Sequence, residues 1–140
     1  MSYQPPKLLT LLMLALLIGA AWASPLKQEY MHRIGELYAI DCSRADSPRV
    51  RLSVKSFDIE AGNKRLRAMD LEDVSLGYWG RNQPPPEFEA VILGTVQPDV
   101  GAAFTINRDK RGQYMTVEGS PKLEAELGKA LLKQKFRRCK

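Results

Sequence analysis

The sequence is poor in the residues from which most catalytic and metal sites are built. It contains one histidine, His32, and two cysteines, Cys42 and Cys139. A serine or cysteine triad needs a histidine base, and a zinc site needs several histidine or thiolate ligands. We interpret His32 as a surface or helix-packing residue. The sequence therefore predicts a protein that is not an enzyme and that uses no metal and no cofactor.

Other motifs are also missing. No glycine-rich loop followed by Lys-Ser or Lys-Thr, as in phosphate-cradling loops, occurs in the chain. The acidic stretch Asp70–Asp73 lacks the alternating oxygen ligands and the glycine of a calcium loop. The chain has no platform of aromatic and basic residues for stacked bases, so we expect no nucleic-acid partner. The acidic stretch leaves one enzymatic alternative open, a carboxylate-based hydrolase of the cell envelope.

The longest apolar run lies near the N-terminus. Leu8–Ile18 is almost entirely aliphatic and is followed by small residues at Ala21 and Ala23. This order is typical of an export signal, and we expect cleavage to remove residues 1–23 and to leave one domain, residues 24–140. An uncleaved anchor is the alternative, although a membrane helix needs about 20 apolar residues. We expect a periplasmic or secreted protein with no stable membrane anchor.

The two cysteines predict one disulfide bond. Removal of residues 1–23 leaves 117 residues with a formal net charge of +4, the size of one ordinary domain. In an oxidising compartment Cys42 and Cys139 have only one intramolecular pairing. The alternatives are two free thiols or a link between two chains. Closing so long a loop would stabilise the fold by about 4 to 5 kcal/mol in the chain-entropy model.

Alternating apolar residues predict a series of antiparallel strands. The clearest is Arg49–Glu60, in which the alternation changes phase and so indicates a β-bulge near Lys55 and Ser56. The stretch Phe88–Val96 is apolar on both faces, as expected of a central strand covered on both sides. The other expected strands are a short one at residues 38–42 that buries the Cys42 sulfur, two at 66–71 and 74–79, and a hairpin formed by 102–107 and 113–118.

Helical patterns occur near both ends of the domain. Apolar spacing predicts a helix within Ser24–Leu37, and Ser120 is a suitable N-cap for a long helix that extends to about Arg138. On that helix Phe136 and Cys139 share one apolar face, which would place the cysteine against the strand of its partner. The expected fold is α+β: an antiparallel, curled sheet of five to seven strands, barrel- or sandwich-like, with a C-terminal α-helix packed on it.

One loop has the composition of a recognition surface. Tyr78, Trp79 and Arg81 precede the triple proline Pro84–Pro86, which is stiff. Aromatic residues and arginine on a rigid loop contribute much of the binding energy in protein interfaces. The same aromatic rings could instead cover the core, and the sequence leaves both interpretations open.

The C-terminal residues form a basic stretch. Lys129–Lys140 contains six cations and no acid, and Lys133 and Arg137 are its candidate binding residues. Such a stretch favours an acidic protein or another anionic envelope component as partner. Cations in the last turns of a helix also complement the helix dipole, which is the structural alternative.

These features together predict a small exported, non-enzymatic binding protein. Its partner would be another macromolecule in the cell envelope or extracellular space. A small-ligand carrier or sensor that uses a pocket in the curled sheet is the alternative from a different class, and an apolar pocket inside the sheet would favour it.

Overall fold

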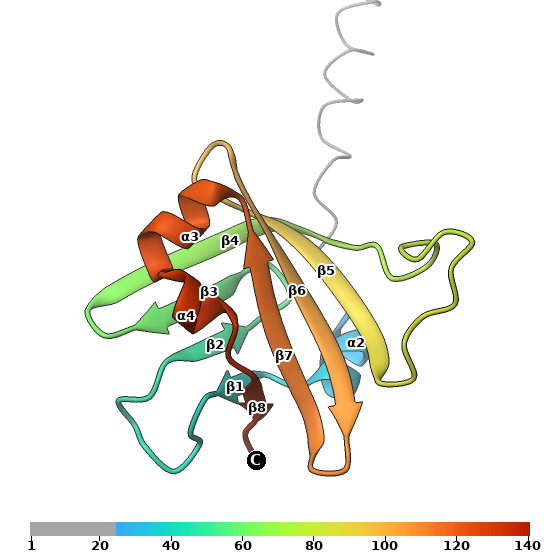
Figure 1. The fold of residues 1–140 in the computed structure, drawn as a ribbon, viewed down its shortest axis with the longest axis horizontal. Helices are drawn as coiled ribbons and strands as arrows, with labels where there is room; N and C mark the ends of the chain where they lie inside the picture. Colours follow the sequence, from blue (N-terminus) through green and yellow to red (C-terminus); the bar gives the residue numbers. More distant parts are fainter. Residues whose placement is uncertain (1–24) are drawn as a thin grey trace, which may run out of the picture.

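The structure, a computed structural model, describes residues 25–140, so the expected signal at residues 1–23 lies outside the described residues. Eight antiparallel strands form a closed barrel in which each strand pairs with its neighbours in sequence and β8 returns to β1 (Figure 1). None of the helices within the described residues is long and apolar enough to span a membrane. The elements are α2 (Gln28–Ile34), β1 (Leu37–Ala39), β2 (Arg49–Leu52), β3 (Phe57–Ala61), β4 (Lys64–Asp73), β5 (Phe88–Val96), β6 (Val100–Asp109), β7 (Gly112–Gly119), α3 (Pro121–Leu127), α4 (Lys129–Leu132) and β8 (Phe136–Arg138).

Three sequence predictions are confirmed. A short helix, α2, precedes the sheet, and β5 has the bounds expected of the central strand. The β6 and β7 strands form a hairpin that closes with Asp109 opposite Gly112. Local sequence patterns were sufficient for these elements because the spacing of the apolar residues within each of them matches its secondary structure.

The barrel corrects the expected number of five to seven strands. The stretch expected as one bulged strand is two strands, β2 and β3, joined by a tight turn. In the turn the Ser53 N–H donates to the Ser56 carbonyl at 2.9 Å, and the Ser56 N–H donates to the Ser53 Oγ at 3.1 Å. Val50 before the turn pairs with Ile59 after it, and both are buried. A hairpin, and not a bulge, therefore changes the phase of the alternation.

Of the two strands expected at 66–71 and 74–79, the first is confirmed as part of a longer strand and the second is wrong. One long strand, β4, covers the first, and its register against β5 shifts between Met69 and Glu72. Asp70 lies in this interval with φ of +52°, a left-handed conformation typical of an irregularity in a strand. The second expected strand is part of a loop, so its alternating apolar residues do not lie on one face of the sheet.

The long C-terminal helix is the third correction. Gly128, with φ of +87°, ends α3, and α4 is a single short turn. The chain then extends into β8, which pairs with β7 on one side and with β1 on the other. Phe136 is buried in the core, whereas the next residue, Arg137, lies outside it. Phe136 and Cys139 therefore share no helical face, and β8 closes the barrel.

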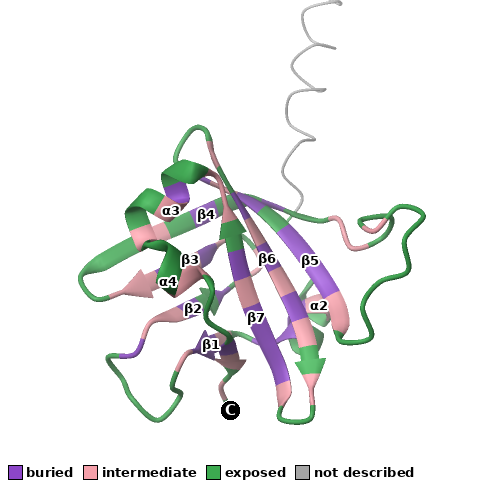
Figure 2. Ribbon diagram, in the orientation of Figure 1, coloured by how far each residue is buried: buried purple, intermediate pink, exposed green. Residues whose placement is uncertain are grey.

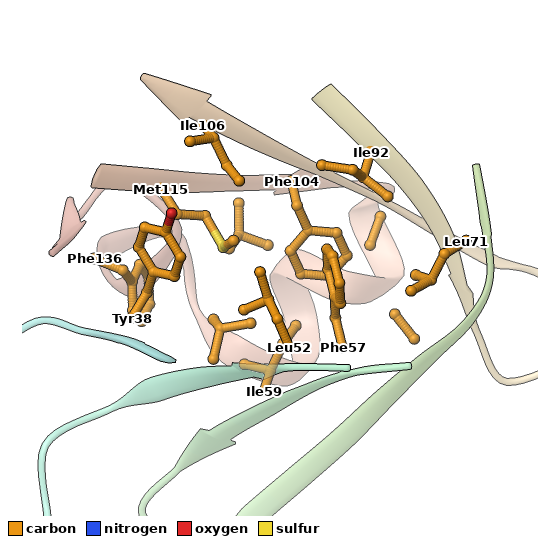
Figure 3. Close-up of a cluster of buried hydrophobic side chains, with 14 of the residues drawn as sticks. Tyr38, Leu52, Phe57, Ile59, Leu71, Ile92, Phe104, Ile106, Met115 and Phe136 are labelled. Atoms are coloured by element: carbon orange, nitrogen blue, oxygen red, sulfur yellow. The ribbon is translucent and has the colours of Figure 1, made fainter. Parts of the chain in front are cut away.

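Side chains fill the interior of the barrel. The rings of Phe57 and Phe104 meet edge to face with centroids 5.0 Å apart at its centre (Figure 3). Tyr38, Met115 and Phe136 occupy the space beside them and are at most 1% exposed. Buried residues also line β5, β6 and β7 along most of their length (Figure 2). The interior is a packed core.

A different helix covers each end of the barrel. The hairpin end is the one with the β6–β7 turn, and there α2 buries Met31 and Ile34 in the core. The α3 end is the opposite one, where Leu123 is fully buried. Gly119 makes room for that side chain, because a Cβ atom at this position would lie 2.2 Å from Leu123 Cδ2.

The predicted disulfide is present. The Sγ atoms of Cys42 and Cys139 are bonded across a sequence separation of 97 residues. The bond ties the loop after β1 to the residue after β8, and the Cys139 N–H also donates to the Leu37 carbonyl at 2.8 Å. Cys42 is exposed and does not lie on a buried face as expected, because β1 ends at Ala39.

Candidate binding surfaces

The five residues predicted to bind a partner occupy three separate places. Tyr78, Trp79 and Arg81 lie in the loop between β4 and β5. Lys133 follows α4 and lines a depression between that helix and β7. Arg137 lies on β8. The structure therefore brings the first three together and separates them from the other two.

The aromatic loop, residues 75–86, is attached to β5 where the pairing of β4 with β5 ends. The Ser75 N–H donates to Asp73 Oδ1 at 2.9 Å, and the Ser75 Oγ accepts from the Val91 N–H at 2.9 Å. The Val74 N–H donates to the Val91 carbonyl at 3.1 Å. Val91 is fully buried, although it does not belong to the core cluster that contains its neighbours Ala90 and Ile92. The loop is therefore anchored at its first residue.

Three aromatic rings hold the middle of the loop in place. The Tyr78 ring lies nearly parallel to the Phe88 ring, with centroids 6.3 Å apart. The Trp79 ring meets Phe88 edge-on at 5.6 Å and Tyr78 edge-on at 5.5 Å. Such geometries contribute about 0.5 to 1.5 kcal/mol per pair beyond the burial of area. Sequence alone missed Phe88 because its place at the start of β5 indicated only a core residue.

The exposed part of the loop is apolar. Leu76 is fully exposed and Tyr78 is 45% exposed, whereas Trp79 is half-buried. The Trp79 Nε1–H is buried and has no hydrogen-bond partner within residues 25–140. Arg81 is exposed and forms no ion pair with a described residue. Trp79 is therefore the more buried of the two rings and Tyr78 the more exposed, and a role of either in recognition stays a prediction.

Arg137 is already paired with an acid. Its Nη1 and Nη2 donate to the two carboxylate oxygens of Asp109 at 2.7 and 2.8 Å. These hydrogen bonds hold the pKa of Asp109 well below its usual range. The guanidinium also lies over the Tyr114 ring, 5.1 Å from its centroid. Arg137 therefore holds β8 against the β6–β7 hairpin.

Tyr114 forms a second link on the outside of the barrel. Its hydroxyl donates to the Glu87 carboxylate, which raises the pKa of Tyr114 to about 12. Lys135 also lies over the ring, with Nζ 4.5 Å from its centroid. These contacts cover Tyr114 although it lies outside the core cluster.

Lys133 lies in a setting of mixed charge. The depression that it lines also contains Lys129, Glu118 and Glu124. Lys133 forms no ion pair with a residue that the structure describes, but the two carboxylates nearby dilute the positive field. The basic stretch seen in the sequence is therefore divided between α4 and β8.

A basic groove of about 670 Å³ lies at the hairpin end of the barrel. It is bounded by the β6–β7 hairpin, the C-terminal residues and the junction between α2 and β1. One acid, Glu36, lines it beside five cations: Arg108, Arg111, Arg137, Arg138 and Lys140. Sequence alone missed the contribution of the hairpin. Two features of the sequence could have indicated it: the basic turn of the hairpin, and the cysteine pair that brings the C-terminal residues to the sheet.

A hydrogen-bonded layer forms the floor of the groove. Gln113 is only 4% exposed, and its Nε2 donates to the Arg33 carbonyl at 3.2 Å and to Glu89 Oε2 at 2.7 Å. Arg108 Nε donates to Glu89 Oε1 at 2.5 Å. Partial burial alone would raise the pKa of Glu89, but the hydrogen bonds from Gln113 and Arg108 lower it. Glu89 is therefore a charged partner of Arg108.

Within residues 25–140, no group of three or more His, Cys, Asp or Glu side chains is arranged to hold a metal ion. Asp70, Glu72 and Glu118 line a depression on the outer face of the sheet. Asp73, the last member of the acidic stretch, accepts hydrogen bonds from Ser75.

Comparison of the chain with protein-family models, curated proteins and solved structures gives no match. Its own residues are therefore the only basis for a functional proposal.

Proposed function

We propose that this chain is an exported, non-enzymatic binding protein that recognises another macromolecule through the aromatic loop. The observation that carries the proposal is the contrast between a fixed loop and its exposed apolar side chains. Ser75 and the three-ring cluster hold the loop, while Leu76 is fully exposed and the Tyr78 ring of the cluster remains partly exposed. A loop held in one conformation loses little conformational freedom when a partner binds.

Export is supported by the disulfide and by the sequence that precedes the domain. Bonds such as that between Cys42 and Cys139 form and persist in oxidising compartments. The apolar run Leu8–Ile18 with its small residues matches a cleaved export signal. The proposed location is the periplasm or the extracellular space.

The packed interior gives no support to a carrier with a pocket inside the sheet. Phe57, Phe104 and their neighbours occupy the space that a ligand would need. The hydrolase alternative keeps one feature, the depression lined by Asp70, Glu72 and Glu118. It is not favoured, because Asp73 of the acidic stretch serves to attach the loop. Recognition on the outer surface is the function that the described residues favour.

Site-specific photocrosslinking tests this proposal. A photoreactive amino acid would replace Leu76 in the full chain, expressed in its own cells. The matched control would carry it in place of Met69, which is 43% exposed and lies on β4. We expect one defined adduct from position 76, absent from position 69 and lost when Tyr78→Ser is added.

Two results would contradict the proposal. One is an adduct of equal yield from positions 76 and 69, and the other is no adduct at all from position 76. Thermal melts of the variants provide the folding control. Replacement of the exposed Leu76 or Met69 should change stability by no more than about 0.5 kcal/mol. Tyr78→Ser also removes two ring contacts, each worth about 0.5 to 1.5 kcal/mol, and should still leave the chain folded.

A further inference from the structure

The basic groove holds more positive charge than its own acids neutralise. Arg108 is paired with Glu89, and Arg137 is paired with Asp109. The other three cations that line it form no ion pair with any residue in the described part of the chain: Arg111, Arg138 and Lys140. Glu36 is its one acidic lining residue. A positive excess therefore faces the open side of the groove.

Arg138 is held in position by neutral groups. Its Nη1 donates to Gln113 Oε1 at 2.5 Å and to the Arg33 carbonyl at 3.3 Å. Its Nη2 donates to the His32 carbonyl at 3.4 Å. A guanidinium has five N–H donors, so these contacts leave others for a ligand. None of the acceptors is a carboxylate, and the side chain therefore keeps its full charge while its conformation is restricted.

Gly35 is needed for this placement of Arg138. A Cβ atom at residue 35 would lie 2.5 Å from Arg138 Nε, which is shorter than the contacts that Cβ atoms make in proteins. The glycine also has φ of +85°, which L side chains rarely adopt. The backbone at the end of α2 is thus shaped to accommodate the guanidinium before any ligand arrives.

Arg108 adds a second guanidinium with donors to spare. Only its Nε is used by Glu89, and the side chain is 56% exposed. Arg111 lies in the turn of the same hairpin and is exposed, so it can approach a ligand from the tip. Planar guanidinium groups bind phosphate oxygens with paired hydrogen bonds, which suits them better to phosphate than a lysine alone.

We propose that the basic groove binds a ligand that carries a phosphate group. A phosphate monoester bears about −1.5 to −2 charges at neutral pH, which matches the positive excess of the groove. Its volume of about 670 Å³ is within the range of small-molecule sites, so it has room for more than a bare ion. The phosphate belongs either to a lipid headgroup or to a soluble molecule. The groove contains no residue of the aromatic loop, so this inference can fail independently of the proposed function.

Two probes distinguish the sources of phosphate. The oxidised full chain would be titrated with pyrophosphate by calorimetry and mixed with phosphatidylcholine vesicles that contain or lack phosphatidic acid. Saturable binding of pyrophosphate indicates a soluble ligand. Binding only to vesicles with phosphatidic acid indicates a lipid headgroup, and either result supports the proposal.

A matched pair of double variants locates the binding. The variant Arg111→Gln/Lys140→Gln removes two exposed groove cations, and we expect it to weaken binding by about tenfold. The control Lys129→Gln/Lys133→Gln removes the same charge from α4 and its end, and we expect a change of less than about twofold at physiological salt. Neither pair forms an ion pair within residues 25–140, so both variants should fold.

Three outcomes would overturn the proposal. The first is no saturable binding of either probe by the wild-type chain. The second is an equal loss of affinity in the groove variant and in the α4 control, which would show nonspecific attraction. The third is a glutamate-rich peptide that displaces pyrophosphate at equal charge, because the groove would then select an acidic protein and not phosphate.

Discussion

The two ends of the barrel are closed in different ways. At the α3 end, Leu123 fills a space that Gly119 leaves open, so burial of an apolar side chain is the main interaction. At the hairpin end, α2 also buries Met31 and Ile34. In addition, Gln113 and Arg138 form a hydrogen-bonded layer there, and the Cys42–Cys139 bond holds the last strand. Hydrogen bonds leave charged groups facing solvent, whereas apolar packing does not. The proposed phosphate site lies at the hairpin end.

Both candidate surfaces are connected to the hairpin end. The aromatic loop rejoins the sheet at Glu87, whose carbonyl accepts a hydrogen bond from the Arg108 N–H at 2.8 Å. The Arg108 side chain lines the basic groove. One backbone hydrogen bond therefore connects the end of the aromatic loop with the strand that carries Arg108.

Of the changes considered, removal of the disulfide should have the largest effect on the stability of the fold. We expect Cys42→Ser/Cys139→Ser to destabilise the fold by up to about 4 to 5 kcal/mol in the chain-entropy model. β8 is only three residues long and depends on this bond to stay beside β1. Binding of a phosphate probe should fall as well, because Arg138 and Lys140 flank Cys139. Urea unfolding of both chains measures the difference, and a change below about 1 kcal/mol would contradict the assigned role.

Leu123→Ala should weaken the opposite end alone. We expect it to cost about 3 kcal/mol, within the range of roughly 2 to 5 for buried leucines, because it leaves a cavity beneath α3. Binding to the basic groove should be unchanged. Leu127→Ala, at a partly buried position on the same helix, is the control and should cost less. Loss of groove binding in the folded Leu123→Ala chain would show that the ends are not independent.

Gln113→Ala should disturb both the stability and the binding of the hairpin end. The change removes two hydrogen bonds, one to the Arg33 carbonyl and one to the charged Glu89, at a cost of about 1 to 3 kcal/mol. These acceptors then keep only the donors from the exposed side chains of Arg138 and Arg108. Arg138 also loses an acceptor that positions it. We expect weaker phosphate binding by calorimetry together with a lower urea midpoint. Thr116→Ala on the same strand is the control, and an equal effect there would refute a specific role for Gln113.

The smallest predicted effect is a pH dependence of the Asp109–Arg137 pair. The pair lowers the pKa of Asp109 in the folded state, so it stabilises the fold above the unfolded pKa of about 3.9. That contribution decreases as the pH falls through the folded pKa. Asp109→Asn should therefore melt at a lower temperature than the wild-type chain from pH 7 to about pH 4, and the gap should narrow in more acidic buffer. A gap that stays constant in strong acid would be inconsistent with this assignment.

Much of the sheet could be predicted from sequence because every second residue of most strands is apolar and points into the core. The apolar stretch Phe88–Val96 and the β6–β7 hairpin are examples. The change of phase near Ser53 has two local explanations, a bulge and a turn, and only the partner strand distinguishes them. The residues near Phe136 fit a helix by periodicity, but pairing with β1 and β7 makes them a strand. Such contacts are tertiary and leave no local pattern.

The candidate surfaces were predictable to different extents. Tyr78 and Trp79 could be identified by residue type and by the prolines that follow them. The groove could not be identified, because Arg108 and Arg138 meet only when β8 closes the barrel. Arg137 was selected for its charge, and only the structure shows that Asp109 already neutralises it.

Amide hydrogen exchange of the oxidised and reduced chains tests most directly whether the two ends are held by different interactions. It would be measured under conditions in which the reduced chain remains folded. We predict that reduction speeds exchange in β8 and β1, while Ala102–Phe104 and Val117, near the α3 end, keep their protection. Equal acceleration at both ends, or none at β8, would contradict the account.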